Sequence, residues 1–364
     1  LSALHRSLRD ELVLSVYVDG TATDPAIQRS WQTQLDNALN DIREWLAGSR
    51  HAEREGFEKC TRFLDEAHAP FKAGFGGPGW VSFITQKGVV ETHVLPVQVP
   101  TLAVWSTGPA VAPYMRALKE TRPVIVILAD ASKADLYRYH AGKIEKLDTI
   151  RSHHVVEPPS HMGGPPRQGF HTGTRGSTGR DAAQRSLLEG RDQMIHEVVE
   201  RVTVAAGADG FIMVGGIKRV VKRIVARFDA SVADRVLELK SLDIHSSPSQ
   251  IADAVKVAAS EFRAAFDNRR LAEIADEAAA GGLGAMGPAD TRLALEQASV
   301  RDLYLTHRYI EDNAAEAEDA VRAALDQQAS VEEVSREAAK DLERVGGMAA
   351  GLRFRPATLE NWIE

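Results

Sequence analysis

The chain has 364 residues, 44% of them hydrophobic and 26% charged, with a net charge of −7. This length predicts two or three domains, and this composition is typical of a globular protein rather than of a disordered or fibrous one. No apolar run approaches the roughly 20 residues that span a bilayer, so no contact with membranes is expected.

Two further features predict where the protein works. Charged residues interrupt the first twenty positions, so we do not expect a secretory signal there. The single cysteine, Cys60, cannot form an internal disulfide, which is typical of a reducing compartment. The sequence therefore predicts a cytoplasmic protein.

Strand and helix patterns alternate over residues 1–117, which predicts a first α/β domain. An apolar run ending in a turn indicates a buried strand, and apolar residues at helical spacing indicate a helix. The predicted elements are a strand at 12–20, a helix at 30–48, a hairpin about Gly88 and a helix at 113–120.

A second α/β domain is predicted over residues 118–246. A long helix begins near Asp181, and its apolar stripe runs from Leu187 and Leu188 to Val202. The other predicted elements are strands at 123–130, 133–142, 143–150, 209–216 and 235–245, and a helix at 217–228.

The third predicted domain, residues 247–364, is another small α/β sandwich. Ser247 is the expected N-cap of a long helix that ends near residue 280. The remaining predicted elements are a connector at 281–288, a helix at 289–299, a strand at 300–307, helices at 311–328 and 331–345, and an edge strand at 346–356.

The net charge differs between these domains. It is −2 over residues 1–117, +4 over residues 118–246 and −9 over residues 247–364. A basic middle between acidic flanks predicts that different parts of the chain meet different partners.

One segment of the middle domain has almost no large apolar side chains that could form a core. Residues 158–180 contain six Gly, four Pro, three Arg and two His, and no Asp or Glu. One interpretation is a disordered surface loop, which is common at this composition. The other is a slim probe whose arginines offer forked donors to phosphates, with Asp181 capping the helix that follows.

The predicted helix at 217–228 carries five cations and no acid. The predicted core face consists of Ile217, Val220, Val221, Ile224, Val225 and Phe228. The opposite face carries the cations Lys218, Arg219, Lys222, Arg223 and Arg227. Such a charged face is either merely solvated or, because its like charges repel one another, a contact for a nucleic-acid backbone.

Other motifs do not predict catalysis or metal binding. Gly282, Gly284 and Gly287 have the spacing of a dinucleotide fingerprint, but they follow a helix rather than a strand, which favours a connector between helices. Four histidines between residues 153 and 171 lack zinc-site spacing. We therefore expect no catalytic residue, no metal and no cofactor.

The order of these elements resembles the middle and C-terminal domains of the archaeo-eukaryotic release factor/Pelota superfamily. The patches that carry the resemblance are "DGFIMVGG", "RVLELKSLDIH", "GPADTRLALEQASVRDLYLTHRYI" and "GGMAAGLRFRP". They cover most of residues 118–364, and residues 1–117 are more weakly similar to the bacterial branch of the superfamily, which includes Balon-like ribosome hibernation factors.

The resemblance implies three small α/β domains, the last similar to the α/β/α sandwich of ribosomal protein L7Ae. It implies a factor that binds rRNA of both subunits in the ribosomal A site. The loop at 158–180 takes the place of the Gly-Gly-Gln loop of release factors, but Gly163-Gly164 is followed by Pro165, which has neither an amide side chain nor an N–H. This predicts a non-catalytic hibernation or rescue factor whose loop contacts rRNA at the peptidyl transferase centre through Gly163, Gly164, Arg167, Gln168, His171, Arg175 and Arg180.

Two further rRNA contacts and a protein contact are implied. Lys218, Arg219, Lys222 and Arg223 form the first. The second rRNA contact is a loop of Gly74, Phe75, Gly76 and Gly77. Its aromatic ring, flanked by glycines, is suited to stacking on a base in the decoding centre. The alternative is that this segment is only a tight turn. The acidic C-terminal domain is implied to meet a translational GTPase or ribosomal proteins.

Two other functions remain open from the sequence. One is a peptidyl-tRNA hydrolase or release factor with a diverged Gly-Gly loop. The other is a metabolic α/β binding protein with an incidental basic face.

Overall fold

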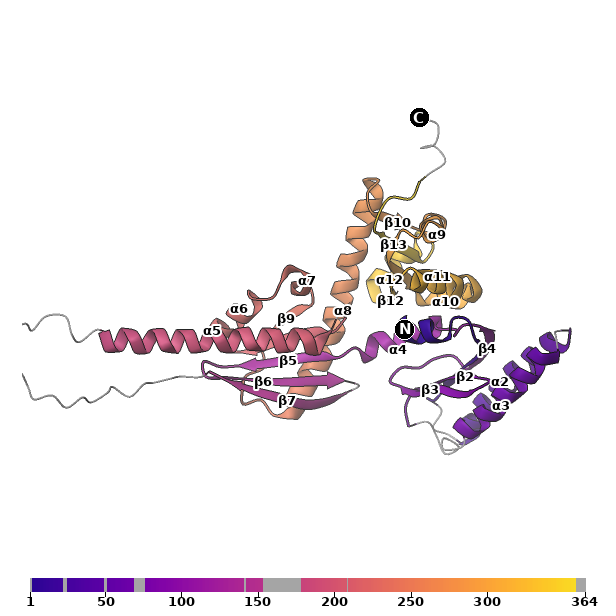
Figure 1. The fold of residues 1–364 in the computed structure, drawn as a ribbon, viewed down its shortest axis with the longest axis horizontal. Coiled ribbons are helices and arrows are strands. Elements are labelled where there is room, and N and C mark those ends of the chain that lie inside the picture. Colours follow the sequence, from indigo (N-terminus) through magenta and orange to yellow (C-terminus); the bar gives the residue numbers. More distant parts are fainter. Residues whose placement is uncertain are drawn as a thin grey trace, which may run out of the picture. The chain divides into compact units, whose positions relative to one another are not determined.

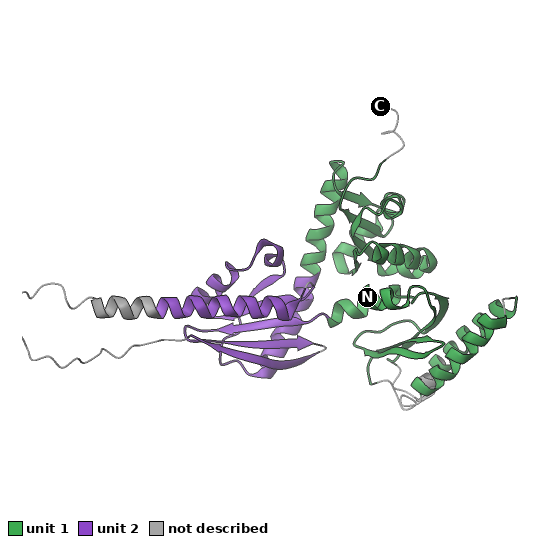
Figure 2. Cartoon of the chain, in the orientation of Figure 1, with its two compact units in different colours: residues 1–121, 264–364 green, residues 122–263 purple. Residues whose placement is uncertain are grey.

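The computed structural model describes residues 2–21, 25–48, 51–68, 76–140, 142–152, 178–207 and 209–357, with backbone only for 25–30 and 178–186. The chain forms two compact units (Figure 2). Unit 1 comprises residues 1–121 and 264–364, and unit 2 comprises residues 122–263. Each of the three predicted domains contains one β-sheet, and the boundaries at residues 117 and 246 remain predictions.

The first sheet of unit 1 is antiparallel, with strand order β3-β2-β1-β4. Its strands and the helices around it are α1 (Ser2–Leu8), β1 (Leu12–Asp19), α2 (Pro25–Trp45), η1 (Leu46–Gly48), α3 (His51–His68), β2 (Gly79–Thr85), β3 (Gly88–Leu95), β4 (Leu102–Thr107), η3 (Ala112–Tyr114) and α4 (Met115–Thr121). The predicted strand, hairpin and helices are confirmed, whereas α1, α3 and β4 were not predicted.

Strand β1 is buried on both faces because its side chains alternate between two cores. Leu14, Val16 and Val18 pack with α2 and α3. Val13 and Tyr17 point the other way, into a core that continues to the second sheet of unit 1. This double burial explains why the strand reads as an almost unbroken apolar run.

The second sheet of unit 1 has the order β10-β13-β11-β12, and only β11 and β12 are parallel. Its elements are α8 (Pro248–Ala279), β10 (Gly284–Met286), α9 (Pro288–Glu296), β11 (Val300–Thr306), α10 (His307–Asp312), α11 (Ala314–Asp326), β12 (Ser330–Val334), α12 (Arg336–Glu343) and β13 (Met348–Leu352). Residues of α9, α10 and α11 pack on one face, and residues of α8 and α12 pack on the other. This α/β/α layering confirms the predicted class; a specific likeness to L7Ae remains a prediction.

Three predictions for this part were wrong. Residues 330–334 form β12 rather than the start of a helix, because parallel pairing with β11 places Val331 and Val334 in cores on opposite faces of the sheet. The segment 281–288 contains the short strand β10 rather than a plain connector. Because β10 pairs with β13, β13 lies inside the sheet rather than at its edge.

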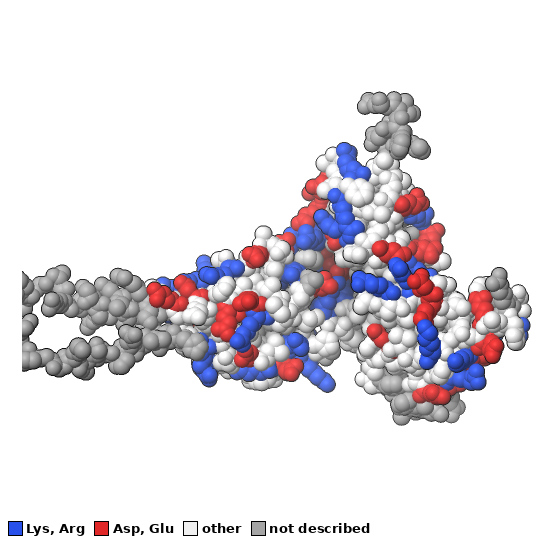
Figure 3. Space-filling model, viewed as in Figure 1, with Lys and Arg blue, Asp and Glu red and all other residues white. Residues whose placement is uncertain are grey.

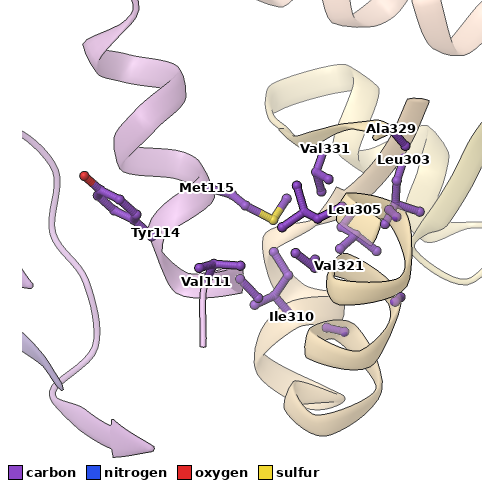
Figure 4. Close-up of a cluster of buried hydrophobic side chains, with 14 of the residues drawn as sticks. Val111, Tyr114, Met115, Leu303, Leu305, Ile310, Val321, Ala329 and Val331 are labelled. Atoms are coloured by element: carbon purple, nitrogen blue, oxygen red, sulfur yellow. The ribbon is translucent and has the colours of Figure 1, made fainter. Parts of the chain in front are cut away.

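A continuous apolar core joins the two sheets of unit 1. Val111 and Met115, which precede and begin α4, point toward Ile310, Leu305 and neighbouring side chains (Figure 4). Buried polar contacts reinforce this core: Glu318 of α11 accepts hydrogen bonds from the backbone N–H groups of Val111 and Ala112 at 3.0 Å.

Unit 2 has a five-stranded mixed sheet of order β7-β6-β5-β8-β9 (Figure 1). Its elements are β5 (Val124–Ala129), β6 (Lys133–His140), β7 (Lys143–Arg151), α5 (Thr178–Ala206), β8 (Phe211–Gly216), α6 (Lys218–Val225), α7 (Ala230–Ala233) and β9 (Val236–Leu239), with the first turns of α8. Helices α5 and α6 cover one face with a shared core. On the other face, Phe262 of α8 meets Phe211 edge-on at 5.3 Å.

Helix α8 begins as predicted. The backbone N–H of Gln250 donates to Ser247 Oγ at 3.3 Å, and the N–H of Ser247 donates to Gln250 Oε1 at 2.9 Å. This reciprocal pair is a capping box, which satisfies two N–H groups at the helix start.

Helix α5 differs from its prediction at its beginning. It starts at Thr178, so Asp181 lies inside the helix and not at its cap. Leu187 and Leu188 are exposed, although they continue the apolar stripe of Met194, Ile195, Val198 and Val202. The reason is that the first turns of α5 extend beyond the strands (Figure 1).

Candidate nucleic-acid interface

Four strands of unit 2, β5, β7, β8 and β9, end at the same side of the sheet. Strands β5 and β8 are parallel, and β7 runs in their direction because β6 is antiparallel to both β5 and β7. We call this side the carboxyl edge: residues 129–132, 151–152 and 215–218. The chain leaves β7 here toward the Gly/Pro/Arg segment, and it leaves β8 here into α6, so the strand end that precedes that segment and the start of α6 lie at one edge of the sheet.

Backbone contacts hold the carboxyl edge together. The N–H of Ser152, directly after β7, donates to the carbonyl of Ser132 at 2.7 Å. Arg191 of α5 donates through Nε to the carbonyl of Ala131 at 3.3 Å. Residues before Arg191 therefore extend past the edge, and since a helix rises 1.5 Å per residue, the 13 residues from Thr178 span about 20 Å.

Asp130 organises the turn between β5 and β6. Its carboxylate accepts hydrogen bonds from the N–H groups of Ser132 at 2.6 Å and Lys133 at 2.8 Å. Partial burial acts to raise the pKa of Asp130, but these hydrogen bonds and that of the Ser132 hydroxyl outweigh it and lower the pKa below its usual value. The carboxylate of Asp130 is thus engaged by hydrogen bonds within its own turn.

Glycine at the end of β8 lets α6 start directly at the edge. Gly216 has φ +118°, and a Cβ there would collide with the carbonyl oxygen of Ala129 on the neighbouring strand. The next N–H, of Ile217, donates to that same carbonyl at 3.0 Å. The first turn of α6 therefore begins beside β5 and presents Lys218 and Arg219 at the edge.

The predicted division of α6 into a core face and a basic face is confirmed for most residues. Val220, Val221 and Ile224 are buried, and Lys218, Arg219, Lys222 and Arg227 are exposed. Ile217 is an exception, because it is the N-cap and is half exposed rather than in the core. Figure 3 shows Lys and Arg side chains along the upper rim of unit 2, where α6 lies, with Asp and Glu beside them.

The cations of α6 are not equivalent. Arg223 is half-buried and forms an ion pair with Asp192 of α5. Within the part of the chain that the structure describes, no ion pair involves Lys218, Arg219 or Lys222. Since Lys218 and Lys222 are one turn apart on the same side of the helix, these three charges form a compact positive surface that a phosphate backbone would neutralise.

Sequence reasoning missed three residues at or beside the carboxyl edge. Arg151 is exposed at the end of β7, Arg191 contacts the β5–β6 turn, and Asp192 engages Arg223. The strand order could have identified Arg151, because parallel strands deliver their carboxyl ends to one edge. The Asp192–Arg223 pair depends on how α5 packs beside α6, for which the sequence carries no signal.

Most of the predicted loop contacts lie outside the described residues. These are Gly163, Gly164, Arg167, Gln168, His171 and Arg175, and for Arg180 only the helical backbone is described. Their roles remain predictions.

The predicted decoding-centre loop is described in part, and Gly74 and Phe75 lie outside. Gly76 has φ +69° and open space around it, whereas a Cβ on Gly77 would collide with the side chain of Val94. Gly77 is thus required by packing, as the alternative of a tight turn predicts, while Gly76 is free for contact.

Two classes of site are not found among the described residues. No three His, Cys, Asp or Glu side chains there are grouped as a metal site would require. Nor is any described helix both long enough and apolar enough to cross a membrane.

Residues 109–260 match the model of bacterial archaeo-eukaryotic release factor family 10. This range contains the whole sheet of unit 2, α5, α6 and the carboxyl edge, so the candidate interface lies within the part that carries the family signature. The predicted resemblance to the bacterial branch of the superfamily is thereby confirmed. No curated protein is detectably similar in sequence.

Solved structures of low sequence identity are also similar. Pelota of Archaeoglobus fulgidus is 15% identical over 77% of this chain and 80% of its own, with a TM-score of 0.32. Dom34 of S. cerevisiae, a translation termination-like factor that interacts with Hbs1, is 11% identical over 77% of this chain and 82% of its own, with a TM-score of 0.48. An archaeal Pelota described as ribosome-bound with ABCE1 is 18% identical over 77% of this chain and 78% of its own, with a TM-score of 0.40. At TM-scores below 0.5, these similarities by themselves establish neither fold nor function.

Proposed function

Since its middle part carries the signature of a bacterial archaeo-eukaryotic release factor, we propose that the protein is a translation factor that binds the A site of idle or stalled ribosomes. In this role it occupies the ribosome and does not release the peptide. Unit 2 faces the rRNA with its carboxyl edge, and the Gly/Pro/Arg loop enters the peptidyl transferase centre.

The observation that supports this proposal most is the exposed charge at the start of α6, which no acid among the described residues engages. Pairing with an acid offsets the repulsion that a cation feels from its neighbours, as Asp192 does for Arg223. Lys218, Arg219 and Lys222 are instead exposed together, at the same edge of the sheet as the end of β7, from which the chain continues toward the acid-free segment 158–180. A polyanion that contacts both would release counterions from its backbone, which favours binding.

The proposed lack of catalysis follows from the loop sequence. Ester hydrolysis needs a positioned water and a donor at the developing oxyanion. Pro165 follows Gly163-Gly164 where release factors have Gln, and it supplies neither an amide side chain nor a backbone N–H.

Ribosome binding through α6 can be tested with two matched double variants. Lys218→Gln/Arg219→Gln removes one Lys and one Arg at the carboxyl edge. Arg138→Gln/Lys143→Gln removes the same two charges from exposed residues of β6 and β7 near the opposite edge. Affinity for vacant 70S ribosomes is measured by pelleting at several salt concentrations.

The first double variant is expected to bind at least tenfold more weakly, with a log–log salt slope that is smaller by about two, as expected for two lost phosphate contacts. The second is expected to bind like the natural protein. Equal losses of affinity in both variants would exclude α6 from the interface. No ribosome binding by the natural protein would refute the proposed function itself.

Catalysis is tested by the release of labelled peptide from 70S complexes with an empty A site. We expect release far below that of a release factor. Release within about tenfold of that control, which corresponds to a barrier difference of roughly 1.4 kcal/mol, would instead favour the peptidyl-tRNA hydrolase.

A further inference from the structure

Unit 1 contains a cavity of about 560 Å³ between β4, the start of α4, and helices α10 and α11. This volume is within the range of pockets that bind ligands or anchoring side chains. Its walls are mostly apolar and include Val99, Leu102, Val104, Ala112, Pro113 and Ile310. Its occupant should therefore bring apolar groups.

The position of β4 indicates the shape of that occupant. Among the described strands, β4 pairs only with β1, so its other edge is open. Leu102 and Val104 are two residues apart on β4 and both line the cavity, as expected for side chains on one face of a strand. A segment that adds to the open edge of β4 would direct every second side chain into the cavity.

The charges around the cavity indicate the sign of the occupant. Glu318 and Arg322 are engaged inside the protein: Glu318 accepts N–H groups of Val111 and Ala112, and Arg322 donates to Glu318 at 3.2 Å and to Ser106 at 2.7 Å.

The remaining ionisable residues that line the cavity are Arg116, His307, Glu311, Asp319 and Glu333. His307 is held between Glu311 at 3.1 Å and Glu333 at 3.5 Å. These three carboxylates exceed Arg116 and His307 by one negative charge even when His307 is protonated, and among the described residues no ion pair engages Asp319. The rim is therefore acidic and attracts a basic partner.

We propose that this cavity and the edge of β4 form a docking site for an extended, basic polypeptide segment of a partner protein. Its aliphatic side chains enter the cavity at every second position, and its Lys or Arg side chains face Glu311 and Asp319. The site belongs to unit 1 and is separate from the interface on α6, so it does not rest on the proposed function.

The sequence pattern of the occupant can be tested with three labelled octapeptides and the full-length protein. The first alternates Arg and Leu, the second Arg and Ser, and the third Glu and Leu. Fluorescence anisotropy at low and physiological salt should show binding of the Arg/Leu peptide, with the other two at least tenfold weaker. Equal binding of the Arg/Leu and Glu/Leu peptides would show an apolar pocket without charge selectivity and would contradict the proposed basic partner. No binding of the Arg/Leu peptide would refute the site.

The location is tested with a matched pair of charge reversals on exposed helical residues of unit 1. Asp319→Lys changes the cavity rim, whereas Asp276→Lys makes the same change on α8, away from this cavity. Asp319→Lys should weaken the Arg/Leu peptide about fivefold or more, and Asp276→Lys should not. An equal loss in both would mean general attraction to an acidic surface.

A blocking variant gives an independent measure. Ala315→Trp places an indole at the cavity mouth from an exposed position on α11, and it should abolish peptide binding at an unchanged melting temperature. Both Asp319→Lys and Ala315→Trp should pellet with ribosomes as the natural protein does in the assay above, which separates failure of this site from failure of the proposed function. Unchanged peptide binding by Ala315→Trp would overturn the proposed location.

Discussion

Lys119 in unit 1 and Lys218 in unit 2 show two uses of the same side chain. Lys119 of α4 is buried, and its ammonium group donates to both carboxylate oxygens of Asp267 and to the carbonyl of Glu333, each at 2.7 Å. Lys218 of α6 is exposed and has no ion pair among the described residues.

The same difference separates the contacts between the two sheets of unit 1 from the α6 face of unit 2. In unit 1, buried or half-buried charges such as Lys119, Asp267 and Glu318 join the two sheets, with Arg322 completing the set. On the α6 face of unit 2, the helix packs against the sheet through an apolar core, and every cation of the helix except Arg223 is exposed. A buried ion pair contributes to a specific arrangement, whereas exposed cations that no acid engages remain available for an external anion.

The largest effect is expected at Lys119. Lys119→Ala leaves the Asp267 carboxylate buried without its partner, which typically costs about 3–5 kcal/mol of unfolding free energy. Burial raises the pKa of Asp267 even with Lys119 in place, so in the variant this carboxylate should take up a proton more readily. Urea denaturation measures the loss. Lys340→Ala, which removes an exposed partner of the exposed Glu337, should show no measurable change. A similar stability of both variants would contradict the comparison.

A somewhat smaller effect is expected at Glu318. Glu318→Ala deprives two backbone N–H groups and Arg322 of an acceptor. It should lower the free energy of unfolding by about 2–4 kcal/mol, since each unsatisfied buried group costs about 1–3 kcal/mol. Glu318→Gln keeps one carbonyl oxygen as acceptor and should recover part of this loss. Asp319→Ala, the exposed neighbour, should change stability by less than about 0.5 kcal/mol. These values can be measured by thermal and urea unfolding, and a loss at Asp319 as large as at Glu318 would contradict the inter-sheet role.

A difference in ribosome affinity is expected between two neighbouring cations of α6. Lys222→Gln removes an exposed charge, whereas Arg223→Gln removes one that Asp192 already engages. Lys222→Gln should reduce affinity for 70S ribosomes several-fold and lower the salt slope by about one. Arg223→Gln should have a smaller effect on the slope and reduce stability by about 0–1 kcal/mol, because a half-exposed pair contributes little. The reverse order of slopes would mean that Arg223 leaves Asp192 on binding.

The smallest effect concerns pH and His307. Its contact with Glu333 raises the pKa of His307, with Glu311 contributing and Arg116 opposing. Because the folded-state pKa is higher than the unfolded one, protonated His307 stabilises unit 1 fully below its ordinary pKa, and this contribution is lost as pH rises through the raised value. The half-exposed ring limits it to below about 1 kcal/mol. His307→Gln should therefore lower the melting temperature slightly at pH 5 and not at pH 9; an equal shift at both values would exclude titration as the cause.

Several features could be predicted from the sequence because they depend on local chemistry. The apolar run of β1, the hairpin about Gly88 and the capping box at Ser247 each follow from residues close together in the chain. The division of α6 into apolar and basic faces follows from its 3.6-residue period. The same local patterns, in their order, predicted the superfamily that the match over residues 109–260 confirms.

Other features were decided only by tertiary structure, because they depend on residues far apart in the chain. Residues 330–334 have helical spacing, but pairing with β11 makes them a strand, and β10 moves β13 from the edge into the sheet. The carboxyl edge arises because β7 and β8 run in the same direction, which brings together two segments that the sequence predicted separately. Arg223 looked equivalent to Lys222 until α5 supplied Asp192. The cavity beside β4 exists because a core shared by the two sheets of unit 1 holds residues 98–116 against residues 307–333, and no pattern within either segment encodes that meeting.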